Sequence, residues 1–129
     1  MKKIFLWLLI CAVIFSMHNN ANAQTNNSSP VLLRHIVMIT FKQDAPADSI
    51  KVLDNIYKNL SKSPVVKDFE MGVNISMRDS DVVKHIYVTT FASKDDMDNY
   101  RKQPEYSKLF HASLPIADDV AVGDYWVNK

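Results

Sequence analysis

Apolar and polar residues alternate along several segments of the chain, and this period of two is typical of half-buried β-strands. The segments 32–41 and 82–91 are rich in β-branched and apolar residues, and 120–127 has a similar composition. In 68–75 the apolar residues Phe69, Met71, Val73 and Ile75 alternate with Asp68, Glu70, Gly72 and Asn74. The pattern therefore predicts four strands.

Between these strands, apolar residues recur at spacings of three and four, the period of a helix that buries one face. The segment 46–60 carries them at Ile50, Leu53, Ile56, Tyr57 and Leu60. Pro64 follows and ends this helix. Ser93 precedes three charged residues and predicts the N-cap of a second helix, which breaks near Pro104 and continues over 105–114.

The order strand, helix, strand, strand, helix, strand predicts an α+β, ferredoxin-like fold: a four-stranded antiparallel sheet with helices on one face. Both faces of the first strand are substantially apolar: His35, Val37, Ile39 and Phe41 point one way, and Arg34, Ile36, Met38 and Thr40 the other. The third strand is similar. A sheet covered by helices on one side only should be polar on the other. We therefore expect a second copy on the free face, giving a dimeric α/β barrel; a monomer with a partly apolar sheet is the alternative.

The first 23 residues have the three parts of an export signal. Met1-Lys2-Lys3 is basic, 4–17 is apolar, and Ala21-Asn22-Ala23 is a small-residue cleavage motif. The apolar part is shorter than the roughly 18 residues that a membrane-spanning helix needs. We therefore expect a signal peptide over 1–23 and an exported protein, periplasmic or secreted, without stable membrane insertion after cleavage.

The rest of the chain is expected to form a flexible linker over 24–31 and one domain over 32–129. A lipoprotein signal ending at Cys11 is the alternative, but the preceding Ile10 is not the small residue that such a motif requires. The formal net charge is +1, and loss of Lys2 and Lys3 takes it to −1. This balance predicts no nucleic-acid partner. Since Cys11 is the only cysteine, the mature protein is expected to contain no disulfide.

Four stretches resemble stress-responsive A/B barrel (Dabb) domains. They are 33–42, 67–74, the region from 89–93 to 100–106, and 120–125. The resemblance extends over 32–127 and implies a ferredoxin-like unit that dimerises into a barrel. It also implies a pocket between sheet and helices in each subunit.

The family includes a plant cyclase that closes a polyketide ring. The resemblance places the cyclase's pocket tyrosine at Tyr100 and its first-strand histidine at His35. Its second-helix histidine falls on Tyr106, and the histidine before the proline falls on Gln103. A free imidazole titrates near pH 6.5 and a free phenol near 10, so Tyr106 does not replace a histidine base. Catalysis is therefore left unassigned, with His35, Tyr100 and Tyr106 as candidates.

The residues expected to line the pocket combine ring or aliphatic area with polar tips: His35, Val37, Ile39, Tyr57, Tyr87, Tyr100 and Tyr106. His85 shares a strand face with Tyr87 but is expected nearer to solvent, and His111 is expected on the surface. The dispersed histidines predict no metal site, and no cofactor motif is present. A cation held by backbone carbonyls of 60–66 is left open.

Three functional hypotheses follow. The leading one is an exported, Dabb-type dimeric barrel that binds a small molecule, such as an aromatic or polyketide-like ligand, without assignable catalysis. The second is an enzyme, either a lyase/cyclase or a cofactor-free oxygenase on a polyketide-like or aromatic substrate. It rests on fold analogy. The third is a structural stress-response dimer without a ligand. A polar cavity favours the first two, and a filled interior favours the third.

Overall fold

The computed structural model describes residues 31–76, 78 and 81–128. The predicted signal peptide and its cleavage site lie outside the described residues, as does the predicted linker apart from Val31. None of the helices in the described part of the chain is long and apolar enough to cross a membrane.

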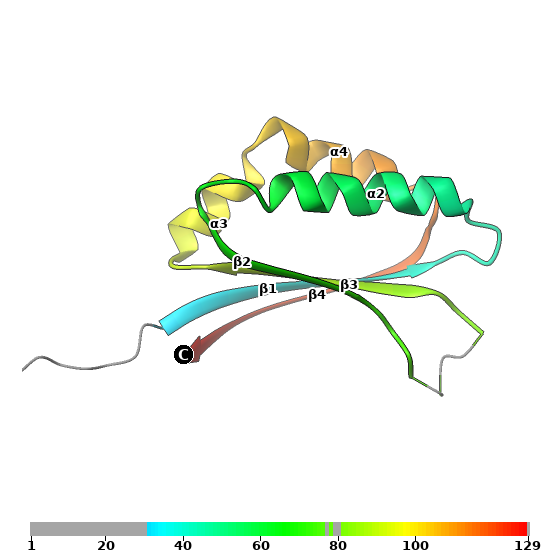
Figure 1. Cartoon of the computed structure of the whole chain (residues 1–129), viewed down its shortest axis with the longest axis horizontal. Coiled ribbons are helices and arrows are strands. Elements are labelled where there is room, and N and C mark those ends of the chain that lie inside the picture. Colours follow the sequence, from blue (N-terminus) through cyan, green and yellow to red (C-terminus); the bar gives the residue numbers. More distant parts are fainter. Residues whose placement is uncertain (1–30, 77, 79–80, 129) are drawn as a thin grey trace, which may run out of the picture.

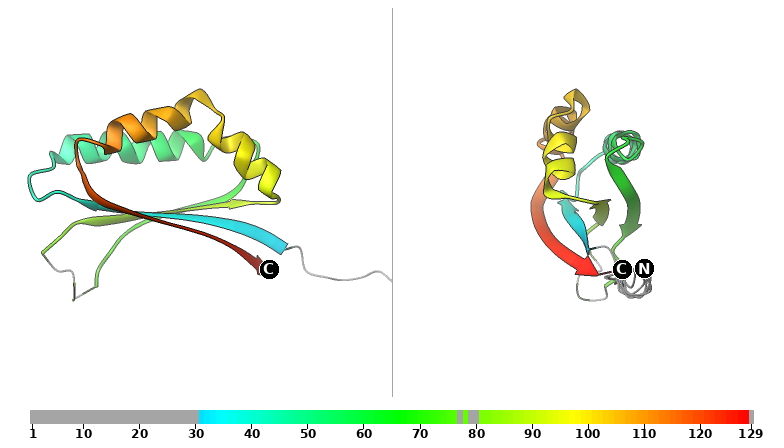
Figure 2. Two further views of the ribbon diagram at one scale, coloured as in Figure 1. Left: turned by 180° about the vertical axis from the view of Figure 1, so that it is seen from behind. Right: turned by 90° about the vertical axis from the view of Figure 1, so that its left-hand side faces the viewer.

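The chain forms one antiparallel sheet with its helices on one side (Figures 1 and 2). In chain order the elements are β1 (Val31–Phe41), α2 (Ala47–Leu60), β2 (Val66–Val73), β3 (Lys84–Phe91), α3 (Lys94–Arg101), α4 (Pro104–Ser113) and β4 (Ala117–Asn128). The strands lie in the order β2-β3-β1-β4. The predicted α+β class and four-stranded antiparallel sheet are confirmed.

The helix boundaries follow from local capping chemistry. The Ser93 hydroxyl accepts a hydrogen bond from the backbone N–H of Asp96 at 3.1 Å, which is the predicted N-cap of α3. Pro104 occupies the first turn of α4, where its missing N–H costs no helical hydrogen bond. The predicted break between the two helices is therefore confirmed.

The ends of β2, β3 and β4 differ from the predicted ones, because a strand extends only as far as a neighbouring strand pairs with it. β2 ends at Val73, opposite His85, and Ile75 beyond it is 94% exposed although it continues the apolar alternation. β3 starts at Lys84 rather than at residue 82. β4 begins earlier than predicted, because a register shift next to Phe41 brings Ala117 into pairing.

The core lies between the sheet and the helices. Alternate residues of β1, beginning with Leu33 and including Val37 and Ile39, are buried against the helices, as the strand pattern predicts. From α2, Leu53 is fully buried, and burial of such a side chain contributes roughly 1.5–3 kcal/mol. On the opposite sheet face, Ile36, Met38, Ile86 and Val88 are half-buried. Within the described part of the chain, all helices lie on the other side of the sheet (Figure 1).

Candidate functional site

A cavity of about 450 Å³ opens between the sheet and the helices, where β1 and β4 face α3 and α4. Its lining comes from five elements: His35, Val37 and Ile39 of β1, Tyr57 of α2, Arg101 of α3, Tyr106, Ser107, Leu109, Phe110 and Ser113 of α4, and Val120 and Val122 of β4. Phe110, Val120 and Val122 are exposed. The lining is therefore mostly apolar, with a few polar side chains, of which Arg101 lies beside His35.

Of the predicted pocket residues, the structure brings five to this cavity: His35, Val37, Ile39, Tyr57 and Tyr106. Their role in binding stays a prediction.

Tyr87 and Tyr100 instead lie in the core, 0% and 1% exposed. The Tyr87 ring stacks on that of Tyr57 at 3.7 Å between centroids. The Tyr100 ring lies edge-on to Phe91 at 5.2 Å and to Tyr106 at 5.5 Å. Neither tyrosine lines the cavity, but each packs against a tyrosine that does: Tyr87 against Tyr57, and Tyr100 against Tyr106.

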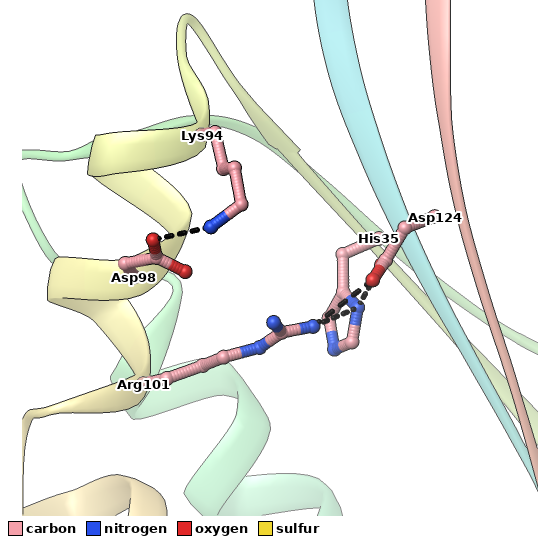
Figure 3. Close-up of polar contacts among 5 residues, drawn as sticks. All are labelled: His35, Lys94, Asp98, Arg101 and Asp124. Atoms are coloured by element: carbon pink, nitrogen blue, oxygen red, sulfur yellow. Dashed lines mark hydrogen bonds and ion pairs between the residues drawn. The ribbon is translucent and has the colours of Figure 1, made fainter.

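A buried histidine is anchored at one end of the cavity. Cross-strand pairing of β1 and β4 sets His35 opposite Asp124, and His35 Nδ1 lies 2.6 Å from Asp124 Oδ1 (Figure 3). A carboxylate only accepts hydrogen bonds, so we assign the proton to Nδ1. The Nε2 atom, which points away from Asp124 in Figure 3, is then an acceptor. The pair holds the imidazole in one orientation, and in its neutral form the ring keeps a lone pair on Nε2.

Arg101 completes this group from α3. Its Nη2 donates to Asp124 Oδ2 at 3.1 Å and lies 3.4 Å from His35 Nδ1 (Figure 3). With Nδ1 protonated, the latter contact joins two donors and is not a hydrogen bond; both donors are held by the same carboxylate. On the same helix, Lys94 pairs with Asp98 at 2.6 Å instead.

The electrostatics of these groups favour a charged Asp124 and neutral tyrosines. Partial burial alone would raise the pKa of Asp124, but the hydrogen bonds and charges of His35 and Arg101 outweigh it and lower that pKa. Burial raises the pKa of Tyr57 and raises that of Tyr100 to about 12. These phenols therefore stay protonated at neutral pH.

A second polar cluster lies deep under α2. Asp54 Oδ1 accepts hydrogen bonds from the Tyr87 hydroxyl at 2.7 Å and from His85 Nδ1 at 2.9 Å. The expectation that His85 lies nearer to solvent is wrong: it is 9% exposed, because α2 covers it and Phe41 packs against its ring at 5.1 Å. Burial, then the Asp54 carboxylate, raises the pKa of Tyr87. This cluster fastens α2 to the sheet.

The other candidates are placed away from the cavity. His111 is exposed on α4, as expected. Gln103, where the resemblance expects a histidine, donates from Nε2 to Ser63 Oγ at 2.8 Å and so ties the turn after α2 to the start of α4. Within the described ranges, no three His, Cys, Asp or Glu side chains are grouped to hold a metal ion. Nothing tests a carbonyl cation site in 60–66.

Three residues of these clusters were missed by the sequence reasoning: Arg101, Asp124 and Asp54. Arg101 and Asp124 lie within the stretches that resemble the family, but no role was predicted for either. A usable signal existed in β4, since Asp124 has the same parity as Val120 and Val122 and so points toward the helices.

Known proteins share this architecture. The family model described as the stress responsive A/B barrel domain (Dabb) matches residues 33–127. No curated protein matches the chain. A solved hydroxynitrile lyase from Passiflora edulis is 25% identical, with a TM-score of 0.67, and the match covers 78% of this chain and 96% of the lyase.

Two other solved structures are less similar in sequence. A dimeric protein with a ferredoxin-like fold from Bacteroides fragilis is 22% identical, with a TM-score of 0.58, covering 74% of this chain and 96% of that one. A cofactor-independent oxygenase from Streptomyces nogalater, solved as a mutant, is 14% identical, with a TM-score of 0.60, covering 76% and 94%. At such identities these two show the fold alone, and that fold is ferredoxin-like.

Proposed function

We propose that this chain, which belongs to the stress-responsive A/B barrel (Dabb) family, binds a small, largely apolar molecule in the cavity beside His35. The observation that carries this proposal is the anchored imidazole. Asp124 holds Nδ1 at 2.6 Å, and Nε2 is left to accept a hydrogen bond in a mostly apolar cavity. A mostly apolar wall with a few fixed polar groups is the usual composition of a small-molecule site.

The size and walls of the cavity define the ligand class. A volume of about 450 Å³ lies within the roughly 300–1,000 Å³ of typical ligand pockets. Val37, Ile39 and Leu109 supply aliphatic walls, and Tyr57 and Tyr106 supply ring area. These surfaces suit an aromatic or polyketide-like body with one hydrogen-bonding group.

The test is a panel of small aromatic compounds observed by ¹H–¹⁵N NMR, with a blocked cavity as the comparison. Ser107 lines the cavity on α4, whereas its exposed neighbour Lys108 does not. Ser107→Phe should abolish the shifts that ligands induce around His35, and Lys108→Phe should leave them unchanged. Absence of any ligand-induced shift in the wild type would refute binding and favour the structural dimer without a ligand.

The geometry of His35 also favours a second candidate, acid–base catalysis. An imidazole oriented by a carboxylate is arranged to take a proton through Nε2. In cyanohydrin cleavage, the reaction that the name of the 25%-identical lyase implies, Nε2 would accept the hydroxyl proton while the C–CN bond breaks and cyanide leaves. Cyanide release from mandelonitrile that disappears in His35→Gln would support a lyase. Equal release by the wild type and this variant would exclude His35 as the base.

We further infer that the protein is a homodimer joined through the free sheet face. Gly72 and Gly123 lie on that face, paired with Ile86 and Ile36. Neither glycine has a positive φ, and a Cβ built on either would meet no atom within 4 Å. The fold of a single chain therefore does not require glycine at either position. A second copy packed closely against this face would require it, because a side chain there would keep the two sheets apart. Among similar structures, the Bacteroides fragilis protein is described as dimeric.

We also propose that the protein is exported, with cleavage after Ala23. The support is the basic, apolar and small-residue pattern of residues 1–23. Intact mass spectrometry of the protein from the producing cell should give a chain that starts at Gln24. A lipid-modified chain that starts at Cys11, or an uncleaved chain, would contradict this proposal.

A further inference from the structure

The charge of the cavity lining is one-sided. Among the described residues that line it, Arg101 is the one with a full charge at neutral pH, and neither Asp nor Glu is present. Asp124 is outside this lining and contacts both Arg101 and His35. A ligand that enters the cavity therefore meets a cation and an imidazole in the lining, while the carboxylate, 35% exposed, is already paired with both.

The Arg101 guanidinium has N–H donors that bond to no described residue. Both of its contacts with described residues, to Asp124 and to His35, use Nη2. The Nε and Nη1 donors are left for solvent or a ligand, and the side chain is 34% exposed. The bond to Asp124 restrains the guanidinium plane, so the remaining donors are presented in a set orientation. The second hydrogen of Nη2, together with that of Nη1 or Nε, still forms a planar donor fork, and such a fork matches a carboxylate.

Proton transfer strengthens this match. With a neutral His35, the charges of Arg101 and Asp124 cancel. If a ligand enters as the neutral acid, its proton can move to His35 Nε2, which gives an imidazolium and a ligand anion. Asp124 stabilises the imidazolium through Nδ1–H, and the anion lies between two cations. A neutral isostere such as an amide gains none of these charge interactions.

We propose that the cavity takes small aromatic or apolar acids, with the acidic group on Arg101 and His35 and the apolar body against Val37, Ile39 and Val122. This inference rests on the proposed function, because it assigns the ligand class of the same cavity. Arg101 thus becomes the residue that selects the ligand by charge.

The experiment compares matched acids and primary amides by ¹H–¹⁵N NMR titration: phenylacetate, 4-phenylbutyrate and 2-naphthylacetate, each with its amide. A hydrogen bond to a charged group is stronger than one to a neutral group, so we expect each acid that binds to bind about tenfold more tightly than its amide. Arg101→Met should remove this preference, by lowering the affinity of each acid to about that of its amide. The neighbouring exposed cation offers a matched control with the same loss of charge, and Lys102→Met should keep the preference.

The outcomes separate the two proposals. Equal affinity of acids and amides in the wild type overturns the acid assignment and leaves small-molecule binding intact. Loss of amide binding along with acid binding in Arg101→Met, with a folded spectrum, shows a positioning role and also overturns it. Binding of neither member of any pair counts against the proposed function itself, and the acid assignment falls with it.

Discussion

Replacing a glycine of the free sheet face by a larger residue should affect the stability of a single chain and the stability of a dimer in opposite directions. Gly123 lies in β4 beside Ile36, and Gly72 lies in β2 beside Ile86. A Cβ at either position meets nothing within 4 Å in the single chain. Valine prefers strands and glycine weakens them, so Gly123→Val should leave an isolated chain as stable or stabilise it by up to about 1 kcal/mol.

In a dimer packed on this face, the same change has the opposite sign. Overpacking a well-filled interface costs about 1–3 kcal/mol at a site, and twofold symmetry places the change twice in the dimer. The total, about 2–6 kcal/mol, weakens association by roughly 30-fold to more than 10,000-fold. Gly123→Ala, which adds one methyl group, should show a smaller effect in the same direction.

Sedimentation velocity over a range of concentrations measures this effect, and urea unfolding reports the stability of each variant. We expect the wild type to sediment as a dimer, Gly123→Ala to dissociate at higher concentration than the wild type, and Gly123→Val to be largely monomeric. The reasoning fails if Gly123→Val stays dimeric with an unchanged dissociation constant and unfolds at higher urea. That result would place any interface on another surface.

Three other perturbations follow from the structure. Met38→Asp should give monomeric or insoluble protein in size-exclusion chromatography, since an unpaired charge in a desolvated interface costs several kcal/mol; an unchanged dimer would count against this face. Tyr87→Phe removes a buried donor to Asp54 and should lower the free energy of unfolding in urea by about 1.5–3 kcal/mol, whereas no change would mean that the cluster does not fasten α2. The folded-state pKa of Asp124 is lowered, so its contribution to stability is present above the unfolded pKa near 4 and is lost as pH falls through the folded value. Asp124→Asn should therefore flatten the decline in stability between about pH 5 and pH 3, and a slope equal to that of the wild type would contradict the assigned pairing.

The residues that the sequence placed correctly are those governed by a local period. Alternation in β1 assigns His35, Val37 and Ile39 to the helix-covered face, because successive strand side chains point to opposite sides. The capping hydroxyl of Ser93 and the proline at residue 104 mark the helix ends through chemistry within one turn. No distant contact is needed for any of these assignments.

The parts that could not be predicted depend on pairing between distant segments. The contact of His35 with Asp124 requires the register of β1 against β4, which shifts at Thr40 and Phe41. Helical period shows that Tyr100 faces inward, but not that it lies under Tyr106 rather than at the cavity.

Asp54 shows the same limit. It follows Leu53 in a helix and is not one of the periodic apolar positions, yet β3 brings two donors to its carboxylate. Charged residues that find their partners through tertiary contacts give no periodic signal of their own.

The central claim is that the cavity is a ligand site organised around a His35 side chain whose orientation Asp124 fixes. The most direct measurement is the ¹⁵N NMR signature of the His35 imidazole at neutral pH, free and with saturating 4-phenylbutyrate, assigned by comparison with His35→Gln. The account predicts a proton on Nδ1 and a lone pair on Nε2 in the free protein, with the Nε2 resonance shifting strongly toward the protonated form on binding. A free protein with the proton on Nε2, or a bound ligand that leaves both His35 nitrogen resonances unmoved, would contradict it.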